Sequence, residues 1–211
     1  MQELDLIEEK IRQNFVAKNA ARDAALGASR EMIRYCSLSI RATHRAEFEE
    51  AAKLLVRTRE MAAQMKSYVA AYSDLYFTGY VQDALKEMAE AHIVYALVTN
   101  APLPDPDGLG VDYAAYLNGL GEAAGELRRY SLDIMRHGTS DQVEKVLAAM
   151  EDIYSMLVTM DFPDALTGGL RRTTDMVRGV LERTRGDLTV AARQEKLEQT
   201  LREFEERIKV Q

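Results

Sequence analysis

Several residue types are scarce in this chain of 211 residues, and each scarcity excludes a class of protein. Tryptophan is absent and cysteine occurs once, at Cys36, which excludes a framework of intrachain disulfides. A lone thiol suits a reducing compartment, and the acidic start lacks the basic and apolar segments of a secretory signal, so we expect a cytoplasmic protein. No run approaches the ~20 apolar residues that cross a bilayer, so no membrane span is expected.

Proline is almost as rare, and its positions divide the sequence. Three of the four prolines lie within residues 101–110, and the fourth is Pro163. Because proline breaks helices, these two places are the clearest interruptions. No segment shows the sustained two-residue alternation that is typical of a strand. The sequence therefore predicts an all-α fold, organised as a single domain over residues 1–211.

The apolar periodicity between the interruptions predicts about seven helices in an antiparallel bundle. The expected ranges are about 4–44, 46–72, 77–98, 112–136, 140–160, 164–185 and from 187 onward. The first range is long for a helix of a globular domain, which favours a break near Gly27.

Polar residues and glycines mark the expected helix ends. Asp112 is a candidate N-cap, and the other expected boundaries are residues 137–138, 139–140 and 186–187. The last helix carries a single apolar stripe, formed by Leu197, Leu201, Phe204 and Ile208.

Two pairs of glutamates lie where a helix should bury apolar residues. Glu87 and Glu90 are three positions apart, which places both carboxylates on one helix face. That face continues one turn later as Val94 and Leu97, so we expect the two glutamates to be partly buried or to face a cleft.

The second pair is Glu122 and Glu126, which are four positions apart on one face. Their stripe begins at Gly119 and continues to Ile134, and it is otherwise typical of a core. The same helix contains three glycines, each of which costs about 1 kcal/mol relative to alanine in a helix interior. We expect a neighbouring helix to approach closely and offset that cost at Gly119, Gly121 and Gly125.

A divalent cation would explain both pairs. If the helices before and after residues 101–110 pack antiparallel, four carboxylates converge, and such groups repel one another and are costly to desolvate. Mg²⁺ or Mn²⁺ removes that cost, because it takes oxygen ligands and suits phosphate hydrolysis. The alternative is that these glutamates are solvated, since 34 acidic residues produce same-face pairs by chance on most helices.

Other reactive side chains point to no site. No histidine follows a glutamate by three positions, so a carboxylate di-iron centre is not predicted. Cys36 is expected to be a small buried residue, and His92 a hydrogen-bonded core residue. No glycine-rich phosphate loop, Ser-His-Asp signature or Cys-x-x-Cys motif is present.

An arginine stripe lies on the first expected helix, although the net charge of −7 argues against indiscriminate binding of nucleic acid. Its spacing of four, seven and four residues places the arginines along one face, where they would contact phosphates. The equally open alternative is a solvated face, paired with Glu31 and with residues 47–50. The stripe consists of Arg30, Arg34, Arg41 and Arg45, with His44 beside the last.

Three segments of the sequence resemble the translin family. Residues 28–44, ASREMIRYCSLSIRATH, resemble its first long helix, and residues 80–91, YVQDALKEMAEA, resemble its central helix. Residues 112–129, DYAAYLNGLGEAAGELRR, resemble the helix after the family's variable loop, with Gly-Glu-Leu at 125–127 as the most telling fragment.

The resemblance is greatest to the catalytic branch of that family. Translin binds single-stranded RNA and DNA, whereas translin-associated factor X carries the metal-dependent endoribonuclease site of a mixed octamer. Glu87 and Glu90 match two glutamates of the catalytic branch that translin lacks. Glu126 matches the glutamate of Gly-Glu-Leu, and Glu122 stands where that branch has aspartate. The sequence is therefore similar to an archaeal or bacterial version of factor X, acting without a second type of subunit.

The family resemblance implies a function and an assembly. It implies a homo-octamer with RNA inside, and a single-stranded RNA substrate, with single-stranded DNA as a further ligand. The four glutamates would hold Mg²⁺ or Mn²⁺ for an endoribonuclease reaction, and the arginine stripe would face the interior. Two alternatives stay open: a translin-like oligomer that binds nucleic acid without cleaving it, and a helical interaction protein.

Overall fold

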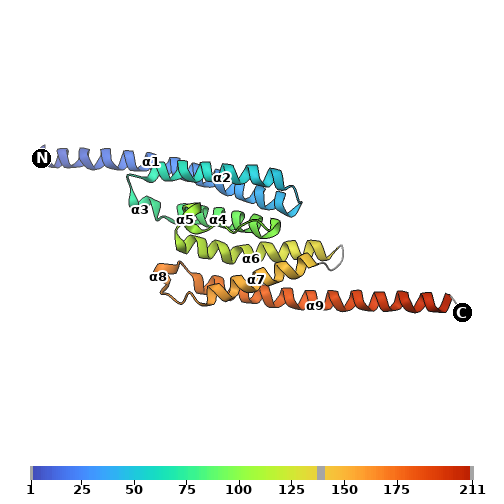
Figure 1. Ribbon diagram of the computed structural model, residues 1–211. Coiled ribbons are helices and arrows are strands. Elements are labelled where there is room, and N and C mark those ends of the chain that lie inside the picture. The colour runs from blue at the N-terminus through green and yellow to red at the C-terminus, as the bar shows by residue number, and fades with distance from the viewer. Residues whose placement is uncertain (1, 137–140, 210–211) are drawn as a thin grey trace.

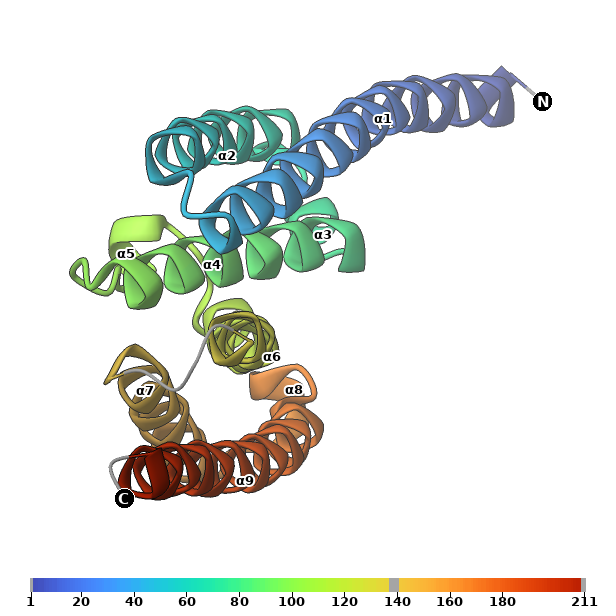
Figure 2. The ribbon, with the colours of Figure 1, turned by 90° about the vertical axis from the view of Figure 1, so that its right-hand side faces the viewer.

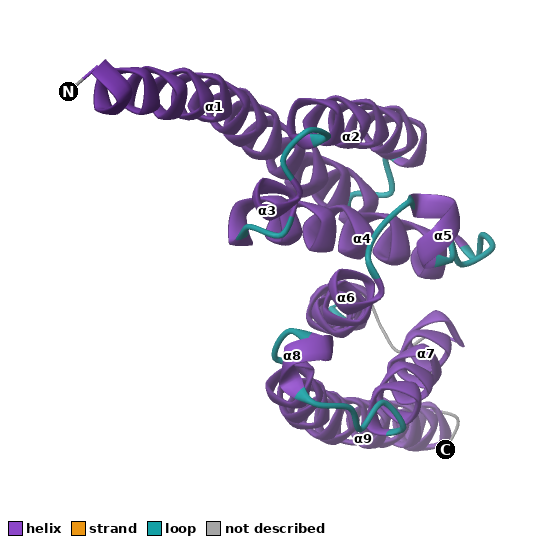
Figure 3. Ribbon diagram, turned by 90° about the vertical axis from the view of Figure 1, so that its left-hand side faces the viewer, coloured by secondary structure: helices purple, strands orange, loops and turns teal. Residues whose placement is uncertain are grey.

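The computed structural model describes residues 2–136 and 141–209, and all regular structure within them is helical (Figures 1 and 3). This confirms the all-α prediction. The six long helices are α1 (Gln2–His44), α2 (Phe48–Val69), α4 (Gly79–Thr99), α6 (Tyr113–Met135), α7 (Asp141–Val158) and α9 (Leu170–Lys209). Three helices of four residues are α3 (Ser73–Tyr76), α5 (Pro106–Leu109) and α8 (Asp164–Thr167). The first two were not predicted. α8 falls within the helix predicted over 164–185, which is interrupted at Gly168 and Gly169, both of positive φ.

Two of the predicted helix breaks are wrong. α1 continues through Gly27, and α9 continues through Gly186. A glycine in a helix interior costs about 1 kcal/mol, which the good helix formers around Gly27 outweigh. Gly186 has threonines and Asp187 nearby, and there the buried side chains of Thr184 and Leu188 hold α9 against the core. Asp187 lies within α9 and caps no new helix, and its carboxylate pairs with Arg128 of α6 at 2.8 Å. The boundaries predicted at residues 137–140 lie outside the described residues.

The helices are stacked in tiers (Figures 2 and 3). α1 and α2 form an antiparallel pair with the most extensive contact between any two helices, and α4 lies beneath them. α6 follows, and α7 and α9 form the far tier. One cluster of buried apolar residues extends from Ala25 to Leu188, and the assignment of one domain to residues 1–211 stays a prediction. In the part of the chain that the structure describes, no helix is both long and apolar enough to cross a membrane.

α4 crosses α6 obliquely instead of running antiparallel to it. Figure 2 shows α6 nearly end-on, whereas α4 lies across the view. The crossing is close at Gly119, where a Cβ would lie 2.6 Å from the carbonyl oxygen of Lys86. A Cβ on Gly121 would likewise overlap the side chain of Thr173 in α9. The predicted close approach is confirmed at these two glycines but not at Gly125, whose surroundings are open.

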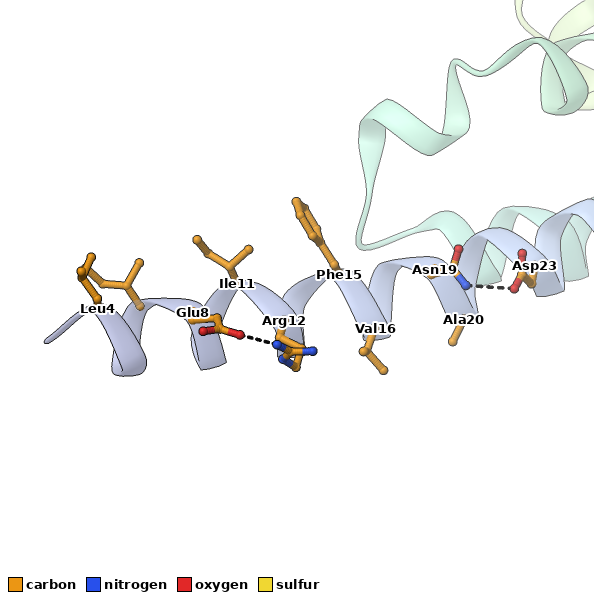
Figure 4. A pocket seen from close by; sticks show the side chains of 10 residues that line it. Leu4, Glu8, Ile11, Arg12, Phe15, Val16, Asn19, Ala20 and Asp23 are labelled. Carbon is orange, nitrogen blue, oxygen red and sulfur yellow. Dashed lines mark hydrogen bonds and ion pairs between the residues drawn. The ribbon is translucent and has the colours of Figure 1, made fainter. Parts of the chain in front are cut away.

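Both ends of the described chain extend beyond the core as single helices (Figure 1). No residue is buried in the first part of α1, residues 2–23, or in the last part of α9, residues 189–209. We call these segments the α1 overhang and the α9 overhang. Figure 4 shows Leu4, Ile11 and Phe15 projecting from one side of the α1 overhang. The exposed apolar side chains are Leu4, Leu6, Ile7, Ile11, Phe15 and Val16 on α1, and Val190, Leu197, Leu201, Phe204 and Ile208 on α9.

Candidate metal centre

Three carboxylates meet where α4 crosses α6. Glu87 and Glu90 come from α4 and Glu122 from α6, and one oxygen of each lies within 4.8 Å of the other two. The three-residue spacing places the two α4 glutamates on one face, and the close contact at Gly119 brings α6 to that face. The structure therefore brings together three of the four predicted glutamates, which we call the carboxylate cluster.

The carboxylate cluster holds more negative charge than its surroundings neutralise. Only 8% of Glu90 is exposed, and burial together with the charges of Glu87 and Glu122 raises the pKa of Glu90 to about 8. Burial, and then the charge of Glu122, also raises the pKa of Glu87. Within residues 2–136 and 141–209, neither Glu87 nor Glu90 forms an ion pair. Like-charged carboxylates in a poorly solvated place favour either a proton or a bound cation.

Lys86 also belongs to this site, and sequence reasoning missed it. Its Nζ donates a hydrogen bond to Oε1 of Glu122 at 2.7 Å. Burial alone would lower the pKa of Lys86, but the hydrogen bond and charge of Glu122 outweigh it and raise that pKa. The sequence did carry a signal, because Lys86 precedes Glu90 by four positions and therefore shares its helix face.

Glu126, the fourth predicted carboxylate, stands beside the cluster and contacts α1. His44 Nε2 lies 3.0 Å from Glu126 Oε2, which is an ion pair when His44 is protonated, although neither atom makes a well-directed hydrogen bond. The contact with His44 lowers the pKa of Glu126; burial opposes this, and the charge of Arg129 adds to it. Arg129, three residues after Glu126, is a second cation that sequence reasoning missed.

The arginine stripe divides into free and paired members. Arg30, Arg34 and Arg41 are exposed, and none forms an ion pair with a described residue. Arg45 is paired with Glu47 at 2.7 Å. Glu31 accepts a hydrogen bond from the Tyr35 hydroxyl at 3.1 Å and forms no ion pair with a described arginine. The pairing that was part of the alternative is found for Arg45, whereas the other three arginines are solvated and have no described ion pair.

The free arginines lie on the exposed part of α1, on the side to which His44 points or farther around, with Arg34 ~160° from Cys36. With ~100° between successive residues of a helix, His44 lies ~80° around α1 from the buried Cys36. Arg30 and Arg41 lie ~120–140° around in the same direction. His44 is only 7% exposed in its side chain and contacts Glu126, so it separates the buried face from the stripe. His44 therefore lies inside the acidic site, and the arginines lie farther around α1, on its exposed face.

Two reactive residues of the core behave as expected. His92 Nε2 lies 3.1 Å from Thr58 Oγ1, and burial lowers the pKa of His92 to about 4, so the ring is neutral at pH 7. Cys36 is buried, and burial followed by the charges of Glu87 and Glu90 raises the pKa of the thiol. Cys36 therefore stays protonated beside the carboxylate cluster and is not a nucleophile.

A groove of about 1130 Å³ opens beside the carboxylate cluster. It is bounded by α4, α6, α8 and the start of α9, and Lys86 and Glu122 line it on the side of the cluster. Arg172 of α9 also lines it. An extended ligand in this groove would reach the carboxylates from the side of Lys86.

The chain is similar to proteins of known structure over most of its length. No family model matches it. It is 30% identical over 191 residues to an uncharacterized protein of Methanocaldococcus jannaschii. The aligned region covers 90% of this chain and 85% of that protein.

Three solved structures share the fold. The crystal structure of AfC3PO has a TM-score of 0.80 and 35% identity, and covers 87% of this chain and 96% of its own. The structure of an AfC3PO complex with duplex RNA has a TM-score of 0.77 and 34% identity, and the match covers 87% of this chain and 95% of the AfC3PO chain. Apo-NeC3PO has a TM-score of 0.78 over 90% of this chain and 98% of its own, but its 21% identity shows the fold alone.

Proposed function

The chain belongs to the translin family, and we propose that it is an endoribonuclease that depends on a divalent cation and cleaves single-stranded RNA. The observation that carries this proposal is the carboxylate cluster, which joins Glu87, Glu90 and Glu122. Nucleic-acid binding is supported by the AfC3PO complex with duplex RNA, a relative with 34% identity. The glutamate pair of α4, which translin lacks, supports the catalytic branch.

The residues of the cluster fit Mg²⁺ or Mn²⁺. All candidate ligand atoms are carboxylate oxygens, the donors that these hard cations prefer. Glu90 is buried without an ion pair among the described residues, so a cation would stabilise its charged form. When bound, the cation supplies positive charge for a phosphoryl group under attack. Glu87, Glu90 and Glu122 would hold it, and Glu126 would complete the acidic wall of the site.

The arginine stripe would hold the RNA backbone. Arg30, Arg34 and Arg41 have no described ion pair to give up, and phosphate contacts dominate the affinity of such proteins. Arg45 first has to leave Glu47. His44 contacts Glu126 and not the solvent, so we assign it to the acidic site, where it would hold that carboxylate in place.

The protein would act as a homo-oligomer in the cytoplasm. The family resemblance implies an octamer, and the two overhangs supply apolar surface that a single chain leaves in water. Such stripes of long helices are typical of helix–helix interfaces between chains. Single-stranded DNA, which shares the phosphate backbone, would be a second ligand.

Cleavage of labelled single-stranded RNA in Mg²⁺ tests the proposal. The wild-type protein should cleave, and Glu126→Ala and Glu90→Gln should lose at least about a hundredfold in rate, since even outer partners of metal ligands are worth 10–100-fold. Glu144→Ala, an exposed glutamate of α7, is the matched control and should cleave normally. Equal cleavage rates of Glu126→Ala and wild type would show that Glu126 does not belong to the catalytic site.

The same experiment separates the alternatives. RNA binding that weakens with salt, without cleavage in any divalent metal, would leave a non-catalytic binding oligomer. No binding of any oligonucleotide at low salt would leave a helical interaction protein.

A further inference from the structure

We propose that the ammonium group of Lys86 acts as a built-in second cation of the carboxylate cluster, so that each chain binds one divalent ion and not two. This inference rests on the proposed function, because it concerns the same carboxylates. It adds a residue that positions a ligand, and it decides the number of ions.

The geometry places Lys86 inside the cluster. Its Nζ lies 2.7 Å from Oε1 of Glu122, and Glu122 also contributes to the group of three carboxylates within 4.8 Å. One carboxylate is therefore shared between an ammonium group and the candidate ion site. Both side chains are partly buried, with exposures of 21% for Lys86 and 33% for Glu122.

The charges around the cluster suit one ion together with the lysine. Hydrolases with two metal ions hold them ~4 Å apart and bridge them by shared carboxylates. Glu122 is the one cluster residue that α6 supplies, and the ammonium group of Lys86 already occupies one of its oxygens. A second divalent ion on that side would have to displace Lys86 or bind beside a like charge. Glu87, Glu90 and Glu122 together are left to hold the first ion.

Lys86 differs from an ordinary surface ion pair. Lys18 also pairs with a carboxylate, that of Asp74, but Asp74 is 65% exposed and lies on the outside of the molecule. Lys86 instead faces three carboxylates, of Glu122, Glu87 and Asp83, all of which stabilise its charge. It also lines the groove beside the cluster. Its ammonium group is thus in a position to hold Glu122 and to meet a phosphate that enters the groove.

Counting bound Mn²⁺ tests the inference without relying on activity. The full-length protein, in its native assembly, is dialysed against Mn²⁺ and the bound ion is counted per chain, with electron paramagnetic resonance to detect coupled ion pairs. We expect one Mn²⁺ per chain in the wild type and in Lys86→Arg, which keeps the charge. We expect two in Lys86→Met, which removes it. Lys18→Met is the matched control and should bind one.

Each result has a definite meaning. Two ions in the wild type, or one ion in both wild type and Lys86→Met, would overturn the inference. If Lys86→Met does not fold, Lys86→Gln replaces it, because the amide keeps a hydrogen bond to Glu122 without the charge. Failure of the wild type to bind any Mn²⁺ or to cleave RNA would instead overturn the proposed function, so the two failures are distinguishable.

Discussion

The carboxylate cluster and the two overhangs depart from the usual distribution of residues in opposite directions. At the crossing of α4 and α6, carboxylates lie where apolar residues normally pack, and Glu90 is only 8% exposed. On the overhangs, apolar residues lie in water, with Leu4 and Phe15 exposed by 67% and 64%. In the first region three carboxylates share one paired cation, Lys86, and in the second apolar surface has no partner among the described residues.

The difference between the two regions indicates what each one binds. Buried charges are costly unless they are paired, so the cluster calls for a cation. Exposed apolar stripes on a long helix are costly unless another apolar surface covers them, so the overhangs call for another helix. The first partner is an ion that neutralises, and the second is a protein surface that excludes water. The following predictions test whether the two regions really differ in this way.

The largest effect is expected from placing charge on an overhang. The double substitution Leu201→Asp and Phe204→Asp should separate the oligomer into single chains of 23.7 kDa, because each buried side chain of this size contributes ~1.5–3 kcal/mol. Light scattering coupled to gel filtration measures the mass. Val56→Asp, at an exposed valine of α2 in the body of the protein, is the control and should keep the oligomer. An unchanged mass for the double variant would show that the α9 overhang is not an interface.

The next effect concerns the pH dependence of stability without metal. Because the pKa of Glu90 is raised to about 8 in the folded protein, its protonated form stabilises the fold below pH 4.5, and this stability is lost as the pH rises through about 8. At ~1.4 kcal/mol per pKa unit, the loss is roughly 5 kcal/mol at most. Glu90→Gln stays neutral, so it should be more stable than wild type at pH 9 and similar at pH 4.5.

Urea unfolding in EDTA at the two pH values measures this difference. Glu144→Gln, at an exposed glutamate, is the control. Its free energy of unfolding should differ from that of the wild type by the same amount at both pH values. If the free energies of unfolding of Glu90→Gln and wild type differ by the same amount at both pH values, the charged form of Glu90 does not destabilise the fold, and the prediction is wrong.

A smaller effect should separate the glycine at the crossing from one nearby. Gly119→Ala should destabilise the fold by about 1–3 kcal/mol, because its Cβ would lie 2.6 Å from a backbone oxygen of α4. Gly125→Ala should stabilise the fold by up to about 1 kcal/mol, because the added Cβ would meet no atom of another element within 4 Å and alanine is the better helix former. Thermal unfolding measures the change in stability of each variant relative to wild type. Similar changes for the two variants would contradict the close crossing of α4 and α6.

The smallest effect is expected in the arginine stripe. Arg34→Ala and Arg41→Ala should each weaken RNA binding severalfold and reduce the slope of log affinity against log salt by ~0.7, the value for one phosphate contact on a single strand. Arg45→Ala should do less, because Glu47 already pairs with that guanidinium. Fluorescence anisotropy in EDTA measures binding without cleavage. An equal loss in all three variants would show that pairing with Glu47 does not matter.

The sequence predicted the long helices better than it predicted their ends. α4 and α6 begin and end close to the expected residues, because proline and Asp112 mark their boundaries. The breaks at Gly27 and Gly186 were wrong. The surrounding helix formers outweigh the cost of a glycine at Gly27, and the packing of Thr184 and Leu188 does so at Gly186. α3 and α5 escaped prediction because four residues are too few to show a period, and the break between α8 and α9 at Gly168 was missed.

For the candidate site, the amino-acid sequence determined the faces but not the distances. Helical spacing alone places Glu87 beside Glu90 and Glu122 beside Glu126, and it also places Lys86 on the face of Glu90. Only the oblique crossing of α4 over α6 decided that Glu122 joins the cluster while Glu126 turns to His44. The physical reason is that periodicity is a property of one helix, whereas the angle at which two helices cross depends on how all their side chains pack.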